Sequence, residues 1–383
     1  MRIFTRLIIA AIAAISLMTL TGCWDDAEIN GRAFVLGFGA DSSNQGYSFT
    51  FQLAIPVSGE SDSSGSIEYT DLTVNEITPA AAVRSLEKDL GREINFEQLS
   101  LIVIGQRLSR DRFIGLTDYF FRRASVRRQS CIAVCEGNAM DFFETSATDK
   151  AVSIDAASTL QSYDSGGGHI SMDLFSLYKK LINRDGFFLP KISASASDSK
   201  GATKEKRNAT LAISGASAYG SDGKYRGELG EDELELLRLT CGSGTNGALA
   251  VYDEQGERYC CQVRQSDCSV KCRIINDTPE FRLNLELVLV PLDAGGIDGG
   301  GYTTESIRHI SESAERTVTS QLEALANKSR KSLGLSLSGL QDIVRQRQPD
   351  WYEIHRTEWE RLFARSEIII TVHCTAAGGG ITK

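Results

Sequence analysis

The first 23 residues decide where this chain folds. Arg2 and Arg6 form a short positive region, and an almost wholly apolar run follows over residues 7–20. The run is too short to cross a bilayer core, which needs about 20 apolar residues. A positive start, a short apolar core and small residues before a cleavage site are typical of an export signal. We therefore predict that residues 1–22 are a signal peptide that is removed, and that the chain folds outside the cytoplasm.

A cysteine stands at the predicted cleavage site. The sequence Leu20-Thr21-Gly22-Cys23 has the form of a lipobox, so we predict that Cys23 becomes the first mature residue and carries a diacylglyceryl group, with fatty acids such as palmitate. Each buried methylene contributes about 0.8 kcal/mol, and two acyl chains suffice for stable anchoring. The lipid would tether the protein to the extracytoplasmic face of a membrane. The alternative is an ordinary secretory signal with a chance cysteine.

Length and composition fit a folded ectodomain on this tether. Residues 23–383 are enough for two or three domains at about 100–200 residues each. The chain is 42% hydrophobic and 24% charged, as is usual for a globular protein. Its formal net charge of −9 becomes −11 once the signal's Arg2 and Arg6 are removed. An acidic surface argues against nucleic acid and against electrostatic binding to anionic lipid.

The cysteines leave three alternatives open. Nine are present, and lipidation of Cys23 leaves eight, which could pair as disulfides outside the cytoplasm. Cys131 and Cys135 lie on one predicted strand, roughly 13 Å apart at about 3.3 Å per residue, too far to bond to each other. Four more form a cluster: Cys260, Cys261, Cys268 and Cys272. This cluster lacks a Cys-x-x-Cys pair, so we predict no metal site, although zinc stays conceivable beside disulfides and free thiols.

The first half of the chain alternates predicted strands and helices. Apolar or alternating runs predict strands at 34–39, 47–55, 67–74, 99–104 and 131–135. Apolar residues at helical spacing predict helices at 79–90 and 115–122, and a helical or mixed stretch at 159–180. Thr78 can cap the first helix, and Gly91 can end it.

The second half begins after a small, polar and charged stretch at 193–206, so we expect a boundary near 195–208. Strands are predicted at 209–219, 281–289 and 367–374, with two or three more within 247–275. Helices are predicted at 231–239, 304–331, 336–347 and 351–363. The whole pattern predicts an α+β protein with two to three mixed-sheet domains flanked by helices. The predicted mature domains are 23–195, a small β-rich middle domain 196–275 with the cysteine cluster, and 276–383 with the long helix.

A search for catalytic patterns in the sequence predicts no enzyme. The four histidines are far apart: His169, His309, His355 and His373. No zinc-protease, nucleophile-elbow or phosphate-loop pattern occurs. We therefore predict no catalytic residue, no cofactor and no metal. One arginine cluster stands out at 122–128, and its members are Arg122, Arg123, Arg127 and Arg128. It could bind an anion or an acidic partner, but a solvated helix end is the more favoured interpretation.

A series of segments resembles one family in order along the chain. They are Gly22-Cys23-Trp24-Asp25 with Glu28-Ile29-Asn30, the runs 87–105, 115–122 and 131–134, Leu189-Pro190, the helices 231–239 and from 304, Asp350-Trp351, 359–363 and the final strand. Together they resemble the Ger(x)C lipoproteins, the C subunits of spore germinant receptors. The chain departs from that pattern at Asp26-Ala27, in the cysteine-rich segment 241–272 and in the glycine-rich tail after Cys374.

The resemblance implies a lipid-anchored, non-enzymatic subunit with a three-domain α+β architecture. It would lie on the outer face of the spore inner membrane, beside an A subunit and a multi-spanning B subunit, in a complex that responds to small nutrients. No ligand-binding residue carries over from the family. Two other functions stay open. One is a solute-binding lipoprotein of a transporter, although the sequence has no paired lobes, and the other is an envelope hydrolase.

Overall fold

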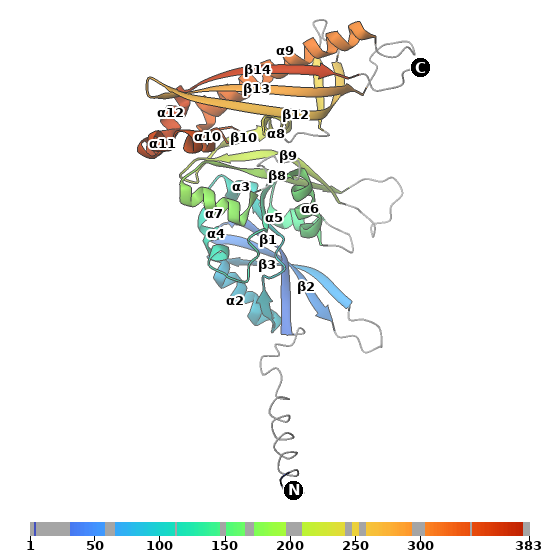
Figure 1. Ribbon diagram of the computed structural model, residues 1–383. Helices are drawn as coiled ribbons and strands as arrows, with labels where there is room; N and C mark the ends of the chain where they lie inside the picture. The colour runs from blue at the N-terminus through green and yellow to red at the C-terminus, as the bar shows by residue number, and fades with distance from the viewer. Residues whose placement is uncertain are drawn as a thin grey trace.

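The computed structural model describes most of the chain after residue 30. The described residues are Phe4, 31–57, 66–111, 113–145, 151–164, 172–196, 209–241, 247–252, 258–292, 303–337 and 339–377. Cys23 and His169 therefore lie outside the described residues. So does most of the polar stretch 193–206, which we call the predicted linker. Two sheets dominate the fold, one above the other in Figure 1. No helix within the described ranges is both long and apolar enough to cross a membrane.

The first sheet has mixed strand directions. Its order is β10-β9-β8-β6-β5-β1-β2-β3, with β4 beside β1 and β7 beside β6. The strands are β1 (Arg32–Ser43), β2 (Gly46–Val57), β3 (Ser66–Glu76), β4 (Glu93–Asn95), β5 (Leu101–Gly105), β6 (Cys131–Cys135), β7 (Met172–Asp173), β8 (Phe187–Ala196), β9 (Ala209–Tyr219) and β10 (Tyr225–Gly230). The central strands β1, β5, β6 and β8 run parallel, and hairpins extend both sides. Because both faces of β5 and β6 are covered, their sequences are continuous apolar runs.

Helices cover the two faces of this sheet. They are α2 (Pro79–Leu90), α3 (Gln106–Ser109), α4 (Ile114–Phe121), α5 (Ala139–Glu144), α6 (Val152–Asp164) and α7 (Leu174–Asn183). Along β5, Ile102 and Ile104 pack with α2, α4 and α7, while Leu101 and Val103 pack with α5 and α6. The predicted ends of α2 are confirmed: the Thr78 side chain accepts from the Ala81 N–H, and Gly91 adopts a φ of 62°.

A buried carboxylate fixes α5 against the ends of the central strands. Asp41 of β1 accepts hydrogen bonds from the backbone N–H groups of Ala139 and Met140, at 2.9 and 3.1 Å. Gly105 makes room for it, because a Cβ there would lie 1.9 Å from the Asp41 Oδ1 atom. A side chain at position 105 would therefore displace the carboxylate and loosen the start of α5.

The second sheet has the order β11-β12-β13-β14. Its strands are β11 (Ala248–Tyr252), β12 (Arg258–Ile275), β13 (Thr278–Pro291) and β14 (Glu367–Ala376). The helix α9 (Thr304–Lys328) packs on it through Val318 and Leu322, and π-helical turns, η2 (Ser329–Leu333), continue α9. The helix α8 (Glu231–Thr240) joins the two sheets, since its leucines share one apolar cluster with Ala216 of β9 and Leu285 of β13.

Short helices close one end of the second sheet. They are α10 (Leu340–Arg347), α11 (Pro349–His355), the 3₁₀ turn η3 (Arg356–Glu358) and α12 (Trp359–Arg365). Their core contains Tyr352, Trp359 and Phe363, which pack with Phe281 of β13. They lie at the left of Figure 1, next to the first sheet and its helix α7.

The predicted α+β class with mixed sheets is confirmed. The structure adds the order in which the strands pair, which the sequence pattern did not predict. Strands of the predicted middle segment, 196–275, are divided between the sheets: β9 and β10 extend the first, while β11 and β12 belong to the second. On either side of the predicted linker, β8 and β9 pair as antiparallel neighbours. The three-domain division itself stays a prediction, because strand pairing does not define domains.

The free thiols include Cys135, Cys260, Cys261, Cys268, Cys272 and Cys374. Cys131 and Cys135 are buried at the two ends of β6, as the strand prediction required. Among the described residues, no three histidine, cysteine, aspartate or glutamate side chains gather in the way a metal site requires.

Candidate functional site

The three described histidines lie in separate surroundings. His355 of α11 stacks on Trp351 and pairs with Asp277 at 3.2 Å. His373 of β14 pairs with Glu315 of α9 at 2.8 Å. His309 lies on α9, half-buried. Two of these three histidines, His355 and His373, therefore pair with carboxylates. Neither of the two lies beside an activated nucleophile among the described residues.

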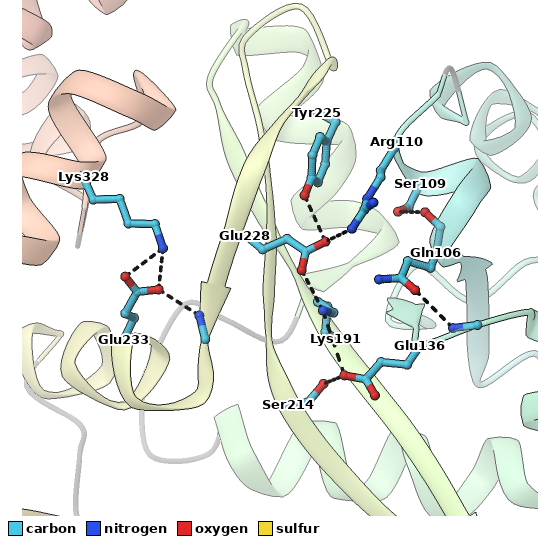
Figure 2. Close-up of polar contacts among 12 residues, drawn as sticks. Gln106, Ser109, Arg110, Glu136, Lys191, Ser214, Tyr225, Glu228, Glu233 and Lys328 are labelled. Atoms are coloured by element: carbon cyan, nitrogen blue, oxygen red, sulfur yellow. Dashed lines mark hydrogen bonds and ion pairs between the residues drawn. The ribbon is translucent and has the colours of Figure 1, made fainter.

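A polar cluster around Glu228 joins two strands of the first sheet to the end of a helix (Figure 2). The Glu228 carboxylate of β10 accepts hydrogen bonds from Arg110 Nη2 at 2.9 Å and from Lys191 Nζ at 2.8 Å. The Tyr225 hydroxyl donates a third at 2.9 Å. Arg110 directly follows α3, and the buried Lys191 belongs to β8. We call these four residues the Glu228 cluster. It ties β8, β10 and the end of α3 together.

The Glu228 cluster keeps its carboxylate ionised. Burial alone would raise the pKa of Glu228, but the hydrogen bonds from Lys191, Arg110 and Tyr225 outweigh that cost and lower the pKa to about 2. A carboxylate with so low a pKa is a poor general acid or base near neutral pH. The cluster is therefore suited to holding elements together rather than to moving protons.

A second polar cluster joins the first sheet to the helices of the second half. Asp185, in the turn after α7, accepts from Gln341 Nε2 at 2.9 Å and from Arg345 Nη2 at 2.6 Å. The Tyr352 hydroxyl accepts from both of these α10 side chains. Lys180 of α7 lies 3.8 Å from the second oxygen of Asp185. We call these five residues the Asp185 cluster. Burial raises the pKa of Asp185, and the charges of Arg345 and Lys180 oppose that rise.

A hollow of about 320 Å³ lies beside the Asp185 cluster, with both halves of the chain in its wall. Its polar groups are largely satisfied within the protein. Glu360 accepts from the N–H and the hydroxyl of Ser221 at 3.0 and 2.6 Å and pairs with Arg226. Arg361 pairs with Glu358. These contacts are typical of a stable interface between two parts of one chain.

Sequence reasoning missed both clusters. It predicted only a helix at 231–239 in this region, and α8 (Glu231–Thr240) confirms that helix. The Glu233 carboxylate accepts from the Gly230 N–H at 2.9 Å and pairs with Lys328 of α9, as Figure 2 shows. Glu228 instead turns toward Arg110 and Lys191. No local pattern signals these partners, because they come from distant parts of the sequence.

The predicted arginine cluster surrounds a second hollow, of about 380 Å³, between α4 and α7. The described residues that line it are Phe120, Phe121, Arg122, Arg123, Ala124, Val126, Arg128, Leu174, Phe175 and Tyr178. The structure thus brings three of the four predicted arginines together, whereas Arg127 donates to Gln98 at 3.0 Å. None of the described lining residues carries a carboxylate. We call this hollow the arginine pocket, and it is the best candidate here for contact with another molecule.

Two family models match the chain one after the other. The model described as the spore germination protein N-terminal domain matches residues 25–194. The model described as spore germination B3/GerAC like, C-terminal, matches residues 214–380. The first match ends within β8 and the second begins within β9, which are paired neighbours. The first sheet is therefore built from both matched regions.

Individual relatives agree with these matches. Spore germination protein B3 of Bacillus subtilis (strain 168) is 22% identical over 356 residues, which cover 92% of each chain. The putative spore germination protein YfkR of the same organism is 29% identical over 132 residues, covering 33% of this chain and 34% of that protein. The crystal structure of the GerBC protein shares the fold, with a TM-score of 0.58 at 18% identity over 89% of this chain and 97% of that one. The chain belongs to the Ger(x)C family of spore germination proteins.

Proposed function

We propose that this protein is the lipid-anchored C subunit of a nutrient germinant receptor, held on the outer face of the spore inner membrane by Cys23. It acts by binding the A and B subunits of the receptor and performs no catalysis. The observation that carries the proposal is the pair of family matches over nearly the whole chain, directly preceded by a lipobox. None of the matches favours a solute-binding lipoprotein of a transporter.

The position of β1 supports this anchoring. The strand β1 (Arg32–Ser43) begins at the end of the molecule that is far from the second sheet (Figure 1). The few residues between Cys23 and Arg32 reach at most about 30 Å when fully extended. A lipid on Cys23 would therefore keep the first sheet close to the membrane and hold the second sheet further out.

The chemistry of the described side chains supports a non-enzymatic role. Burial raises the pKa of the Cys261 thiol to about 11 and that of Cys268 to about 12. Thiols with such pKa values stay protonated near neutral pH and are poor nucleophiles. Glu228 stays ionised and bound to its cationic partners. These groups stabilise the fold, which leaves surface contacts as the means of action.

The proposal is tested in spores that carry Cys23→Ala at the native locus, with Cys272→Ser as the matched control. The wild-type and control chains are expected to incorporate labelled fatty acid, partition with detergent and co-purify with the A and B subunits. The Cys23→Ala chain is expected to lose the label, and its spores to lose most of their nutrient response. An unchanged response of spores lacking the whole gene, in a strain without a second receptor, would contradict the proposal.

A further inference from the structure

The helix α7 is apolar on two faces. Leu174 and Leu177 face the core of the first half and are buried. On the outer face, Phe175, Tyr178 and Ile182 are 43%, 44% and 60% exposed. Their spacing places them along one side of the helix. Contiguous exposed apolar side chains of this kind mark interaction sites.

The end of α4 and the exposed apolar side chains of α7 together line a hollow. The ring centroids of Phe121 and Tyr178 lie 5.1 Å apart. Both residues line the arginine pocket together with Phe175. A partner's apolar side chain can therefore insert between α4 and α7 instead of resting on a flat surface. We define the docking surface as the arginine pocket together with Ile182.

The docking surface is positively charged, although the chain is acidic. Arg122, Arg123 and Arg128 line the pocket, and Lys179 Nζ lies 4.7 Å from the centre of the Phe175 ring. Arg123 is held over the rings of Phe96 and Tyr119, at 5.3 and 4.7 Å. With a net charge of −9 for the whole chain, this concentration of cations beside aromatic rings favours a partner that brings carboxylates.

We propose that the docking surface binds a segment of another receptor subunit that presents apolar side chains flanked by carboxylates. This inference rests on the proposed function and adds to it a surface and the chemistry of the segment that occupies it. The apolar side chains fill the space between Phe121, Tyr178 and Ile182. The carboxylates pair with the guanidinium groups of Arg122 and Arg128, whose planar form suits two-point contact.

Two features favour a protein segment over a lipid surface. The stripe from Phe175 to Ile182 is about 10 Å long at 1.5 Å per residue, which suits the side chains of successive turns of a partner helix. The surface also lies on the flank of the molecule, whereas β1 begins at its lower end (Figure 1). A membrane approached from the end where β1 begins would not meet α7 first.

The experiment compares two double variants in the lipid-anchored full chain. The docking variant is Ile182→Ser with Arg122→Glu. Its matched control is Ile354→Ser with Arg308→Glu, since Ile354 is 75% exposed and Arg308 pairs with Glu312 across one helical turn as Arg122 does with Asp118. The A and B subunits recovered with each chain from detergent-solubilised spore membranes are quantified by mass spectrometry. The unfolding midpoint of each purified chain confirms its folding.

We expect the docking variant to recover at least ten-fold less of one partner subunit than the wild type, and the control to stay within two-fold. A photoreactive residue in place of Phe175 is expected to cross-link to a segment of that subunit with carboxylates beside apolar residues. If the docking variant recovers its partners like the control, the inference is wrong while the proposed function stands. If the wild type recovers no partner subunit, both fail.

The remaining outcomes identify other occupants and overturn the inference. A cross-link from position 175 to a second copy of this chain would assign the surface to self-association. Loss of binding to phosphatidylglycerol vesicles by the docking variant, with full recovery of the subunits, would assign the surface to lipid.

Discussion

Two of the places where arginines lie over aromatic rings differ in their carboxylates. At the Asp185 cluster, Arg345 lies over the Tyr352 ring and pairs with Asp185 and Asp342. At the docking surface, Arg123 lies over the Phe96 and Tyr119 rings, and no described lining residue is acidic. The same residue types thus fasten the chain to itself at one place. At the other, the described carboxylate that pairs with a pocket arginine is the exposed Asp118, so the pocket itself stays open to a partner.

The largest expected effect on stability comes from removing the buried carboxylate of the Asp185 cluster. Asp185→Ala removes the charged acceptor that Arg345 and Gln341 share in a buried site, and leaves them the Tyr352 hydroxyl. We expect the free energy of unfolding to fall by about 3 to 5 kcal/mol, as when one partner of a buried ion pair is removed. Urea unfolding of the mature chain measures it.

Asp185→Asn is the informative companion to this variant. It keeps an oxygen that can accept from Gln341 and Arg345, and it removes the charge whose burial has raised the pKa of Asp185. We therefore expect a smaller loss than for Asp185→Ala. Equal losses would mean that the charge, and not the acceptor, makes the contribution.

The Glu228 cluster predicts a pH-dependent effect of somewhat smaller size. Folding lowers the pKa of Glu228 from its ordinary 4.5 to about 2, which corresponds to at most about 3 kcal/mol of stability. This contribution is complete above about pH 4.5 and is lost as the pH falls toward 2. We expect Glu228→Gln to be clearly less stable than the wild type at pH 7, and the difference to shrink by pH 3. A constant difference between pH 7 and pH 3 would contradict the assigned pKa.

Local signals explain which parts of the fold the sequence predicted. The helix at 79–90 follows a capping threonine and ends at a glycine, and both ends act through backbone groups a few residues away. The alternation at 281–289 reflects a strand with one covered face. Continuous apolar runs marked β5 and β6 because both faces of these strands are covered. In each case the determining contacts repeat along a single element.

Contacts between distant segments explain what the sequence could not predict. The pairing of β8 with β9 across the predicted linker depends on a register that no local pattern encodes. Glu228 meets Lys191, which is 37 residues away, and Arg110, which is 118 residues away. The arginines at 122–128 were visible in sequence, but the pocket beside them was not, because α7 supplies its other wall. Lipidation of Cys23 stays a prediction, since that residue lies outside the described part of the chain.

Variants of the docking surface are expected to affect stability very little. Ile182 is exposed, so Ile182→Ser should change the free energy of unfolding by less than about 0.5 kcal/mol. Leu177→Ala, on the inner face of the same helix, serves as the contrast and should cost about 2 to 5 kcal/mol. Chemical unfolding of both variants measures the difference. A large loss for Ile182→Ser would mean that the outer face of α7 already stabilises this chain.

The smallest effect on stability is expected at Asp118, the carboxylate that pairs with a pocket arginine among the described residues. Asp118 pairs with Arg122 at 2.6 Å, and both side chains are exposed. Exposed pairs of this kind contribute little, because water and salt screen them. We expect Asp118→Ala to leave the unfolding midpoint unchanged within the error of calorimetry. The same change removes the acid that competes for Arg122, so recovery of the partner subunit should stay the same or rise. If Asp118→Ala lowered that recovery as Arg122→Glu is expected to do, the ion pair itself would be the recognised feature, and the partner's carboxylates would have no role at Arg122.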